Sequence, residues 1–273
     1  MTTKASRTHF PVQLCPPDDF LHKQNPNHLT LLSYNMQVGI HTRHYQDYLY
    51  KSWQHLWPSR SRLQNLQRIG NLIKHFDVVA LQEADGGSFR SHFINQIEYL
   101  ANLAGQPYWY QQLNRNLGRL AQHSNGVISR YHPIAIETHA LPGLRGRGAI
   151  AVQFGTRDPL LLVMMHLALS KKGQDQQLRF VSHLIQRYPH VVLMGDMNTH
   201  TSRLLTDSPL SSCGLKAAHA RATFPSWQPQ RCLDHILVSN HLNITRVGVL
   251  DFPLSDHLPV ALEIELPGNV ELH

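Results

Sequence analysis

Short apolar segments that end in a polar side chain recur along the chain. The four clearest segments, each with its final residue, are LTLLSYN ending at Asn35, DVVALQE at Glu83, LLLVMMH at His166 and HVVLMGD at Asp196. A fifth polar group, Ser255-Asp256-His257, comes directly before the apolar run PVALEIEL. One polar strand end means little, because strand ends are often polar. Five of them predict that these side chains meet at one end of a sheet.

The remaining pattern predicts short strands and about three long helices. Apolar residues recur at helical spacing over 61–76, from Phe93 to Leu103, and from Leu178 to Ile185. Further short strands are separated by segments rich in Gly and Pro, such as LPGLRGRG. No repeat or linker interrupts them. We expect a single α+β layered sandwich over residues 29–266, after an extended or poorly ordered lead-in (1–28) and before a short C-terminal tail (267–273).

The polar strand ends have spacings that matter for chemistry. Residues two apart on a strand point to the same face, so Asp196 and Asn198 are expected to reach toward one point. Asp256 and His257 are adjacent and are expected to serve different partners. Carboxylate and amide oxygens without cysteine suit Mg²⁺, with Mn²⁺ or Ca²⁺ as substitutes, better than structural zinc.

The ordered motifs resemble those of the endonuclease/exonuclease/phosphatase superfamily, the deoxyribonuclease I-like phosphohydrolases. The resemblance covers about residues 29–266 and rests on SYN (33–35), LQE (81–83), HL (166–167), GDMN (195–198), LDHILVS (233–239) and SDHLPV (255–260). It implies a four-layer α/β/β/α sandwich with two packed mixed, mostly antiparallel sheets. It also implies metal-assisted hydrolysis of a phosphoester.

The resemblance implies a metal site with Glu83 as a principal ligand, Asn35 beside it and Asp256 as a further ligand. The alternatives that the sequence leaves open are an exposed strand-end carboxylate for Glu83 and a structural amide for Asn35. Asp196 matches the residue that orients or deprotonates the attacking water, and Asn198 matches its phosphate-binding neighbour.

Two histidines and one aspartate complete the implied catalytic set. His257 matches the histidine that contacts the scissile phosphate, and Asp234 matches the aspartate that hydrogen-bonds it. A structural, salt-bridged role stays open for Asp234, and a core role stays open for His166. A histidine at position 166 resembles the deoxyribonuclease, phosphoinositide phosphatase and sphingomyelinase branches of the family, which have histidine at the matching position.

Two residues are implied as phosphate contacts outside this set. Asn125, in SNGVISRYHPI, is expected to face the site, and Arg147, in LRGRGAI, is expected to contact phosphate, with Arg145 as a substitute. A guanidinium can hold two phosphate oxygens at once. A purely solvated arginine remains the alternative for both.

The net charge of +7 favours an anionic partner without choosing one. Nucleic acid is favoured slightly over a lipid headgroup, because basic residues cluster near the first loop: Arg43, Lys51, Arg60, Arg62 and Arg68. The aromatic residues of the same region can stack on a sugar, a membrane interface or bases, or can pack the loop onto the core: Tyr45, Tyr48, Tyr50, Trp53 and Trp57. TFPSWQP (223–229) has the same ambiguity.

The substrate alternatives are a phosphodiesterase acting on nucleic acid, and a phosphodiesterase or phosphatase for phospholipid headgroups, inositol phosphates or another small metabolite. A non-catalytic binding module is disfavoured by the complete set of candidate residues. The Lys-x-Tyr-Gly motif of abasic-site enzymes is replaced by LQEADGGSFRS, which argues against a sequence-specific repair role. No apolar segment approaches transmembrane length, and we expect a cytoplasmic monomer.

Overall fold

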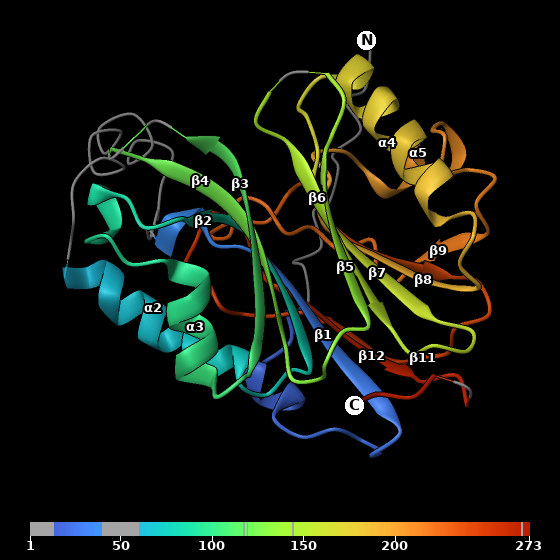
Figure 1. The fold of residues 1–273 in the computed structure, drawn as a ribbon, viewed down its shortest axis with the longest axis horizontal. Coiled ribbons are helices and arrows are strands. Elements are labelled where there is room, and N and C mark those ends of the chain that lie inside the picture. The colour runs from blue at the N-terminus through green and yellow to red at the C-terminus, as the bar shows by residue number, and fades with distance from the viewer. Residues whose placement is uncertain (1–13, 40–59, 117, 119, 144, 269) are drawn as a thin grey trace, which may run out of the picture.

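Two six-stranded sheets pack face to face in the computed structural model (Figure 1). The model describes residues 14–39, 60–116, 118, 120–143, 145–268 and 270–273. In spatial order, the first sheet contains β11 (Ile244–Val249), β12 (Val260–Glu265), β1 (His28–Asn35), β2 (Val78–Asp85), β4 (Gln122–Ser129) and β3 (Tyr108–Asn116). The second contains β5 (Ala135–Ala140), β6 (Gly148–Phe154), β7 (Leu160–His166), β8 (His190–Asp196), β10 (Asp234–Ser239) and β9 (Leu215–Ala217).

Both sheets are mixed. Within the described residues, β1 pairs with β2 and β7 pairs with β8 in parallel, and the other strand pairs are antiparallel. Helices cover the outer faces: α2 (Arg60–Ile73) and α3 (Gln96–Ala104) on the first sheet, α4 (Lys171–Ile185) and the short α5 (Thr201–Thr206) beside the second (Figure 1). The expected four-layer α/β/β/α sandwich is therefore confirmed.

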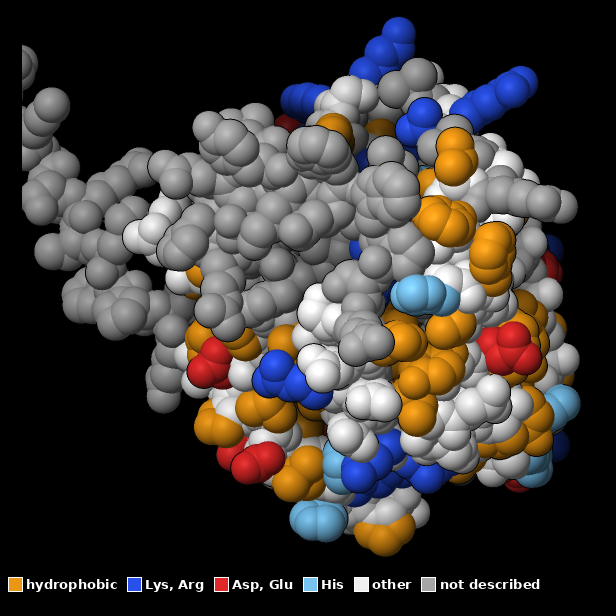
Figure 2. All heavy atoms as spheres, turned by 90° about the vertical axis from the view of Figure 1, so that its left-hand side faces the viewer, with side chains coloured by type: hydrophobic (Ala, Val, Ile, Leu, Met, Phe, Trp, Pro, Cys, Tyr) orange, Lys and Arg blue, Asp and Glu red, His pale blue; other side chains and the backbone are white. Residues whose placement is uncertain are grey.

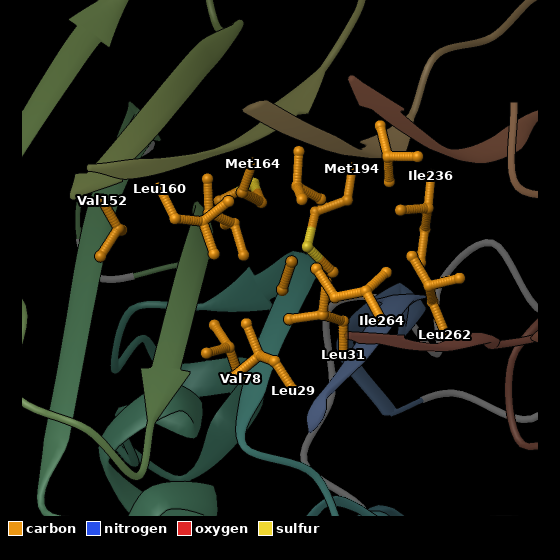
Figure 3. Packing of buried hydrophobic residues seen from close by; sticks show 14 of the residues in the cluster. Leu29, Leu31, Val78, Val152, Leu160, Met164, Met194, Ile236, Leu262 and Ile264 are labelled. Atoms are coloured by element: carbon orange, nitrogen blue, oxygen red, sulfur yellow. The ribbon is translucent and has the colours of Figure 1, made fainter. Parts of the chain in front are cut away.

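The central core lies between the sheets. Figure 3 shows Leu29, Leu31 and Val78 of the first sheet facing Met164 and Met194 of the second, all fully buried. Two further apolar clusters lie outside this layer, one under α2 and α3 and one under α4. Burying both faces of each sheet explains why several strands are continuous apolar runs, not alternating ones.

Besides β9 and α5, which were not predicted, two differences between the structure and the sequence-based elements have a clear local cause. Strand β3 was not predicted, because its sequence YWYQQLNRN is an edge strand with no fully buried residue and so lacks an apolar run. The second helix begins only at Gln96, since Asn95 caps it by accepting hydrogen bonds from the backbone N–H groups of Ile97 and Glu98. Phe93 lies before the cap and is 61% exposed, so its place in the helical pattern was misleading.

Both described ends of the chain pack against the sandwich. Phe20, in a short 3-10 helix (η1, Pro17–Phe20), is buried and stacks on Phe76. Near the other end, Val270 joins the core between the sheets. None of the helices in the described part of the chain is long and apolar enough to cross a membrane.

Candidate active site

The inward-facing row of side chains on several strands changes from apolar to polar at one end of the sandwich. On β8 the row runs Val192, Met194, Asp196, and the first two belong to the central core. The same alternation places Asn35 on β1, His166 on β7 and Asp234 on β10 at the ends of inward-facing rows. The period of two therefore sends these polar groups into the gap between the sheets.

Strand pairing brings three of these groups side by side. His166 is the register partner of Asp196 across β7 and β8, and Asp234 is the partner of Asp196 across β8 and β10. Asn35 reaches Asp196 from the opposite sheet, where its Nδ2 donates a hydrogen bond to Asp196 Oδ2 (3.1 Å). Asp196, 2% exposed, is thus the centre of the site.

Glu83 reaches the site through a break in strand regularity. The register between β2 and β4 shifts between Leu81 and Ala84, and Glu83 has a positive φ of 55°. A bulge of this kind redirects a side chain that strand alternation would send the other way. The Glu83 carboxylate Oε1 lies 3.9 Å from His166 Nε2.

Gly195 allows β7 and β8 to approach closely beside Asp196. Its φ is 142°, and a Cβ at this position would lie 1.9 Å from the carbonyl oxygen of Met165. No other residue fits here without moving the backbone, so the glycine in the segment GDMN is a steric requirement of the site.

Asn198 lies at the site by a route other than the expected one. Strand β8 ends at Asp196, and Asn198 has a positive φ of 51°, so strand alternation does not align the two residues as the sequence analysis supposed. Instead the backbone N–H of Asn198 donates to Asp196 Oδ1 (3.0 Å), and its Nδ2 donates to the carbonyl of Leu167 (3.0 Å). A left-handed turn therefore holds the amide beside the carboxylate.

Asp234 and His257 form a buried hydrogen-bonded pair. His257 Nδ1 donates to Asp234 Oδ2 (2.8 Å), and His257 Nε2 lies 3.9 Å from Asp196 Oδ2. Burial alone lowers the pKa of His257, but the carboxylates of Asp234 and Asp196 outweigh burial and hold the pKa well above its usual range. The two carboxylates therefore favour the imidazolium form of His257, whose Nε2 faces Asp196 at the centre of the site.

His166 has the opposite protonation state. Burial lowers the pKa of His166 to about 3, and Arg147 contributes in the same direction, against the effect of Asp196. Its Nε2 lies 3.5 Å from Asp196 Oδ2. The site thus pairs one neutral and one charged imidazole on either side of the same carboxylate.

The acidic side chains form a donor set that fits a divalent cation. Burial raises the pKa of Asp256 to about 6, and Glu83 and Asp196 add to the rise, against the opposing effect of His257. Several carboxylates that disfavour one another's charge are stabilised by a bound cation, and oxygen donors suit Mg²⁺, Mn²⁺ or Ca²⁺. Asn35 Oδ1 adds an amide oxygen on the same side of the site, where it accepts the N–H of Gln37 (3.3 Å).

A second group of side chains can also hold a metal ion. Ligand atoms of Asp196, Asp234 and His257 lie within 4.8 Å of one another. A protonated imidazole does not ligate a metal, however, and the pKa of His257 is raised. The set of Glu83, Asp256 and Asn35 is a separate candidate, in which Glu83 lies close enough to raise the pKa of Asp256.

The segment TFPSWQP (223–229) packs against the pair formed by Asp234 and His257, so at least part of it has a structural role beside the site. Thr223 Oγ1 donates to Asp234 Oδ2, and the ring of Phe224 lies 4.9 Å from the ring of His257. Oδ1 of Asp234 is buried and has no hydrogen-bond partner within the described residues. The segment thus helps position Asp234, a role that its aromatic content alone did not reveal.

A cleft of about 450 Å³ opens beside the catalytic groups. Glu83 and His166 line it, together with Asn125 and Arg147. Both residues that were expected to contact phosphate outside the main set therefore lie at the site. Asn125 is buried and its Nδ2 lies 3.4 Å from the carbonyl of Gly148. Burial lowers the pKa of Arg147, while Glu83 and Asp196 act against it, which places the guanidinium in the field of both carboxylates.

The cleft contains the two arginines that the sequence analysis named as phosphate contacts, Arg145 and Arg147, but none of the described basic side chains near the first loop that favoured nucleic acid. Arg62 is buried, and Arg68 lies over the ring of Phe252 (6.0 Å) on the outer face of the first sheet. The other cationic and aromatic candidates of the first loop lie outside the described residues or have side chains that are not described: Arg43, Lys51, Arg60, Tyr45, Tyr48, Tyr50, Trp53 and Trp57. Arg115 and His123 also line the cleft. Arg115 was missed because β3 was missed, and His123 because β4 begins at Gln122, before the apolar run that predicted this strand.

Comparisons with known proteins agree with this geometry. The family model described as "Endonuclease/Exonuclease/phosphatase family" matches residues 32–257. Among solved structures, an endonuclease/exonuclease/phosphatase from Beutenbergia cavernae DSM 12333 superposes with a TM-score of 0.66 at 19% identity, covering 89% of this chain and 72% of that one. The mannosyl-6-phosphatase Bt3783 of Bacteroides thetaiotaomicron VPI-5482 gives 0.65 at 17% identity, covering 87% and 100%.

A third solved structure, ANGEL2, described as a 2',3'-cyclic phosphatase, has a TM-score of 0.59 at 13% identity and covers 88% of this chain and 96% of its own. No curated protein matches the chain in sequence. At these identities the structures show the fold alone. Fold and site together define a phosphoester hydrolase. The chain belongs to the endonuclease/exonuclease/phosphatase family.

Proposed function

We propose that the protein is a divalent-metal-dependent phosphodiesterase that acts on nucleic acid. The observation that carries this proposal is the shared cleft, in which Glu83 and His166 lie beside Arg115, Arg145 and Arg147. A wall of guanidinium groups next to a hydrolytic centre suits a polyanion. The charge of +7 acts in the same direction.

Glu83, Asp256 and Asn35 would hold the cation. When bound, a divalent ion supplies Lewis-acid polarisation of a phosphoryl oxygen and neutralises charge on the leaving oxygen. The other roles belong to the side chains of this chain.

Asp196 is proposed to orient the attacking water and to accept its proton. Hydrogen bonds from Asn35 and from the backbone of Asn198 fix both of its oxygens. A carboxylate held in this way can position water for in-line attack without first reorganising.

His257 is proposed to stabilise charge that develops on the phosphoryl group. Asp234 holds its Nδ1, which leaves the charged Nε2–H free to donate toward the phosphate. His166 and Asn198 would contribute N–H donors without adding charge.

A second candidate function is hydrolysis of a small phosphorylated metabolite. The volume of the cleft, about 450 Å³, is typical of a small-molecule pocket. The similarity in fold to a mannosyl-6-phosphatase is compatible with this candidate. Lipid headgroups and inositol phosphates belong to the same alternative.

Nicking of supercoiled plasmid tests the proposal. The wild type is assayed with Mg²⁺ and with EDTA, beside a His257→Ala variant purified in the same way to expose nuclease contamination. Nicking that needs metal and is lost in the variant supports the proposal. Hydrolysis of bis(p-nitrophenyl) phosphate without nicking moves the assignment to the small-molecule candidate. The absence of both activities overturns the proposal.

A further inference from the structure

One wall of the cleft is more basic than a single scissile phosphate requires. Among the described residues that line it are three arginines, Arg115 from β3 and Arg145 and Arg147 from the turn between β5 and β6, and a single acidic residue, Glu83. Figure 2 shows Lys and Arg side chains gathered at the top of the molecule, the end at which Figure 1 places the turn between β5 and β6. The wall therefore combines arginines from both sheets.

The two sheets are joined directly beneath this wall. Gln112 Nε2, on β3, donates to the carbonyl of His139, on β5 (2.8 Å). The turn after β5 is closed by a hydrogen bond from the backbone N–H of Leu141 to the carbonyl of Arg147 (3.0 Å). The backbone that carries Arg145 and Arg147 is thus held in place against β3.

Gly146 lets the turn lie close to Arg115. Its φ is 98°, and a Cβ there would lie 3.8 Å from Cβ and 4.0 Å from Cδ of Arg115. Arg115 therefore extends past the glycine that separates Arg145 from Arg147. The three guanidinium-bearing residues converge because of this contact, not because of their order in the sequence.

The three arginines have different electrostatic surroundings. Arg147 is half-buried and lies in the field of Glu83 and Asp196, which assigns it to the scissile phosphate. Arg115 and Arg145 are exposed, and in the described part of the chain neither forms an ion pair with a carboxylate. Two unpaired cations beside a reaction centre favour an anion on the substrate.

We propose that Arg115 and Arg145 bind a second phosphate group next to the scissile one. The substrate class is then a phosphodiester that carries a further phosphate on one flank, supplied either by the next linkage of a strand or by a terminal phosphomonoester. This inference rests on the proposed function and narrows it. Guanidinium groups bind phosphate through paired hydrogen bonds, which gives the subsite both charge and geometry.

A series of short thymidine substrates tests the subsite. TpT carries only the scissile diester, pTpT and TpTp add a terminal phosphate on either side, and TpTpT adds an internal one. For the wild type, we expect kcat/KM for the best of the three to exceed that for TpT by about 10-fold to 100-fold, the gain of one or two charge-assisted contacts. If TpTpT shows the preference, the strand supplies the second phosphate, and if only pTpT or TpTp shows it, a terminal group does.

The double variant Arg115→Gln/Arg145→Gln assigns the preference to the wall. We expect the ratio of kcat/KM between the preferred substrate and TpT to fall to within about 2-fold of unity, since the paired contacts to the second phosphate are lost. Arg157→Gln is the matched control, because Arg157 is exposed in the turn between β6 and β7, at the other end of these strands, and it keeps the full ratio. The inference is overturned if the wild type does not prefer any further-phosphorylated substrate over TpT. It is also overturned if that preference persists in the double variant, and both conclusions hold even if TpT itself is hydrolysed.

Binding separates this inference from the proposed function. If none of these short substrates is hydrolysed, titration calorimetry decides the subsite by itself, and plasmid nicking still decides the proposed function. The Asp196→Asn variant in EDTA is titrated with TpT and with each phosphorylated form. Tighter binding of one form by about 10-fold, lost on adding the two arginine substitutions, supports the subsite, and equal affinities overturn it.

Discussion

The first sheet buries polar groups at both of its ends, and the two ends are built differently. At the start of β2, the buried carboxylate of Asp77 accepts hydrogen bonds from the N–H and Oγ1 of Thr30 (2.9 Å each) and ion pairs with Lys23 (2.7 Å) and Arg130 (3.3 Å). Nearby on β12, Glu263 binds Arg246, His28 (2.7 Å) and the N–H of Gln24 (2.8 Å). Each buried charge at this end has fixed partners of opposite sign.

The catalytic end leaves its charges incompletely matched. Oδ1 of Asp234 has no hydrogen-bond partner within the described residues, and burial raises the pKa of Asp256 to about 6. Glu83 and Asn198 have positive φ angles, which cost non-glycine residues free energy. Satisfied polar groups stabilise a fold, whereas unsatisfied and strained groups are retained where a ligand completes them. The comparison thus separates a structural end from a functional end of the sandwich.

Asp196→Asn gives the largest expected effect. Losing the carboxylate that we propose to orient and deprotonate the attacking water lowers kcat/KM by about 10³-fold to 10⁴-fold. The melting temperature stays within about 2 °C, because the change also removes repulsion among clustered carboxylates. Steady-state kinetics and thermal denaturation check both outcomes, and activity above one tenth of the wild type contradicts the assigned role.

Asp77→Ala, at the structural end, is expected to lower stability and leave activity nearly unchanged. The substitution leaves buried donors unsatisfied and lowers the free energy of unfolding by about 3 kcal/mol, while kcat of the folded protein changes by less than about 2-fold. Urea denaturation measures the loss. Asp207→Ala is the matched control, since Asp207 forms an exposed ion pair with Lys171 and its loss costs less than about 0.5 kcal/mol.

Gly195→Ala affects stability and activity together. The added Cβ would lie 1.9 Å from the carbonyl of Met165, so β7 and β8 must separate and displace Asp196. We expect a loss of about 2 kcal/mol in stability and a fall in kcat of at least about 10-fold. Gly268→Ala, with no atom within 4 Å of the added Cβ, serves as the control, and a Gly195→Ala variant equal to it would show that the close approach is unimportant.

Glu263→Gln gives the smallest effect, and it depends on pH. Burial tends to raise the pKa of Glu263, but hydrogen bonds from His28, the N–H of Gln24 and Arg246 outweigh burial and lower it. The contribution of a group with a lowered pKa is fully present above its unfolded pKa, about 4.3, and is lost as pH falls through the folded value. The wild type is then more stable than the variant by about 1 kcal/mol at pH 7, and the difference shrinks below pH 4. A difference in unfolding free energy that grows on acidification contradicts the lowered pKa.

The strand ends show how far the sequence predicts the site. Asn35, His166 and Asp196 follow from the apolar segments that they end, which are visible in the sequence. Asp234, at the start of β10, was implied by the family resemblance alone. Asn198 was placed near Asp196 for a wrong reason, since a left-handed turn and not strand alternation brings it there. Arg115 was missed because an edge strand needs no apolar run.

The strands, the helices and the polar residues that end several strands could be predicted from the sequence, because burial and strand period leave a local pattern of hydrophobicity. Which of these strand ends meet, and which charge each side chain favours, depends on packing between segments that are distant in the chain. The imidazolium of His257 and the neutral imidazole of His166 differ through neighbours that lie far away in the chain. The basic wall likewise requires β3 and the turn after β5 to pack together, a contact between two sheets that no local pattern encodes.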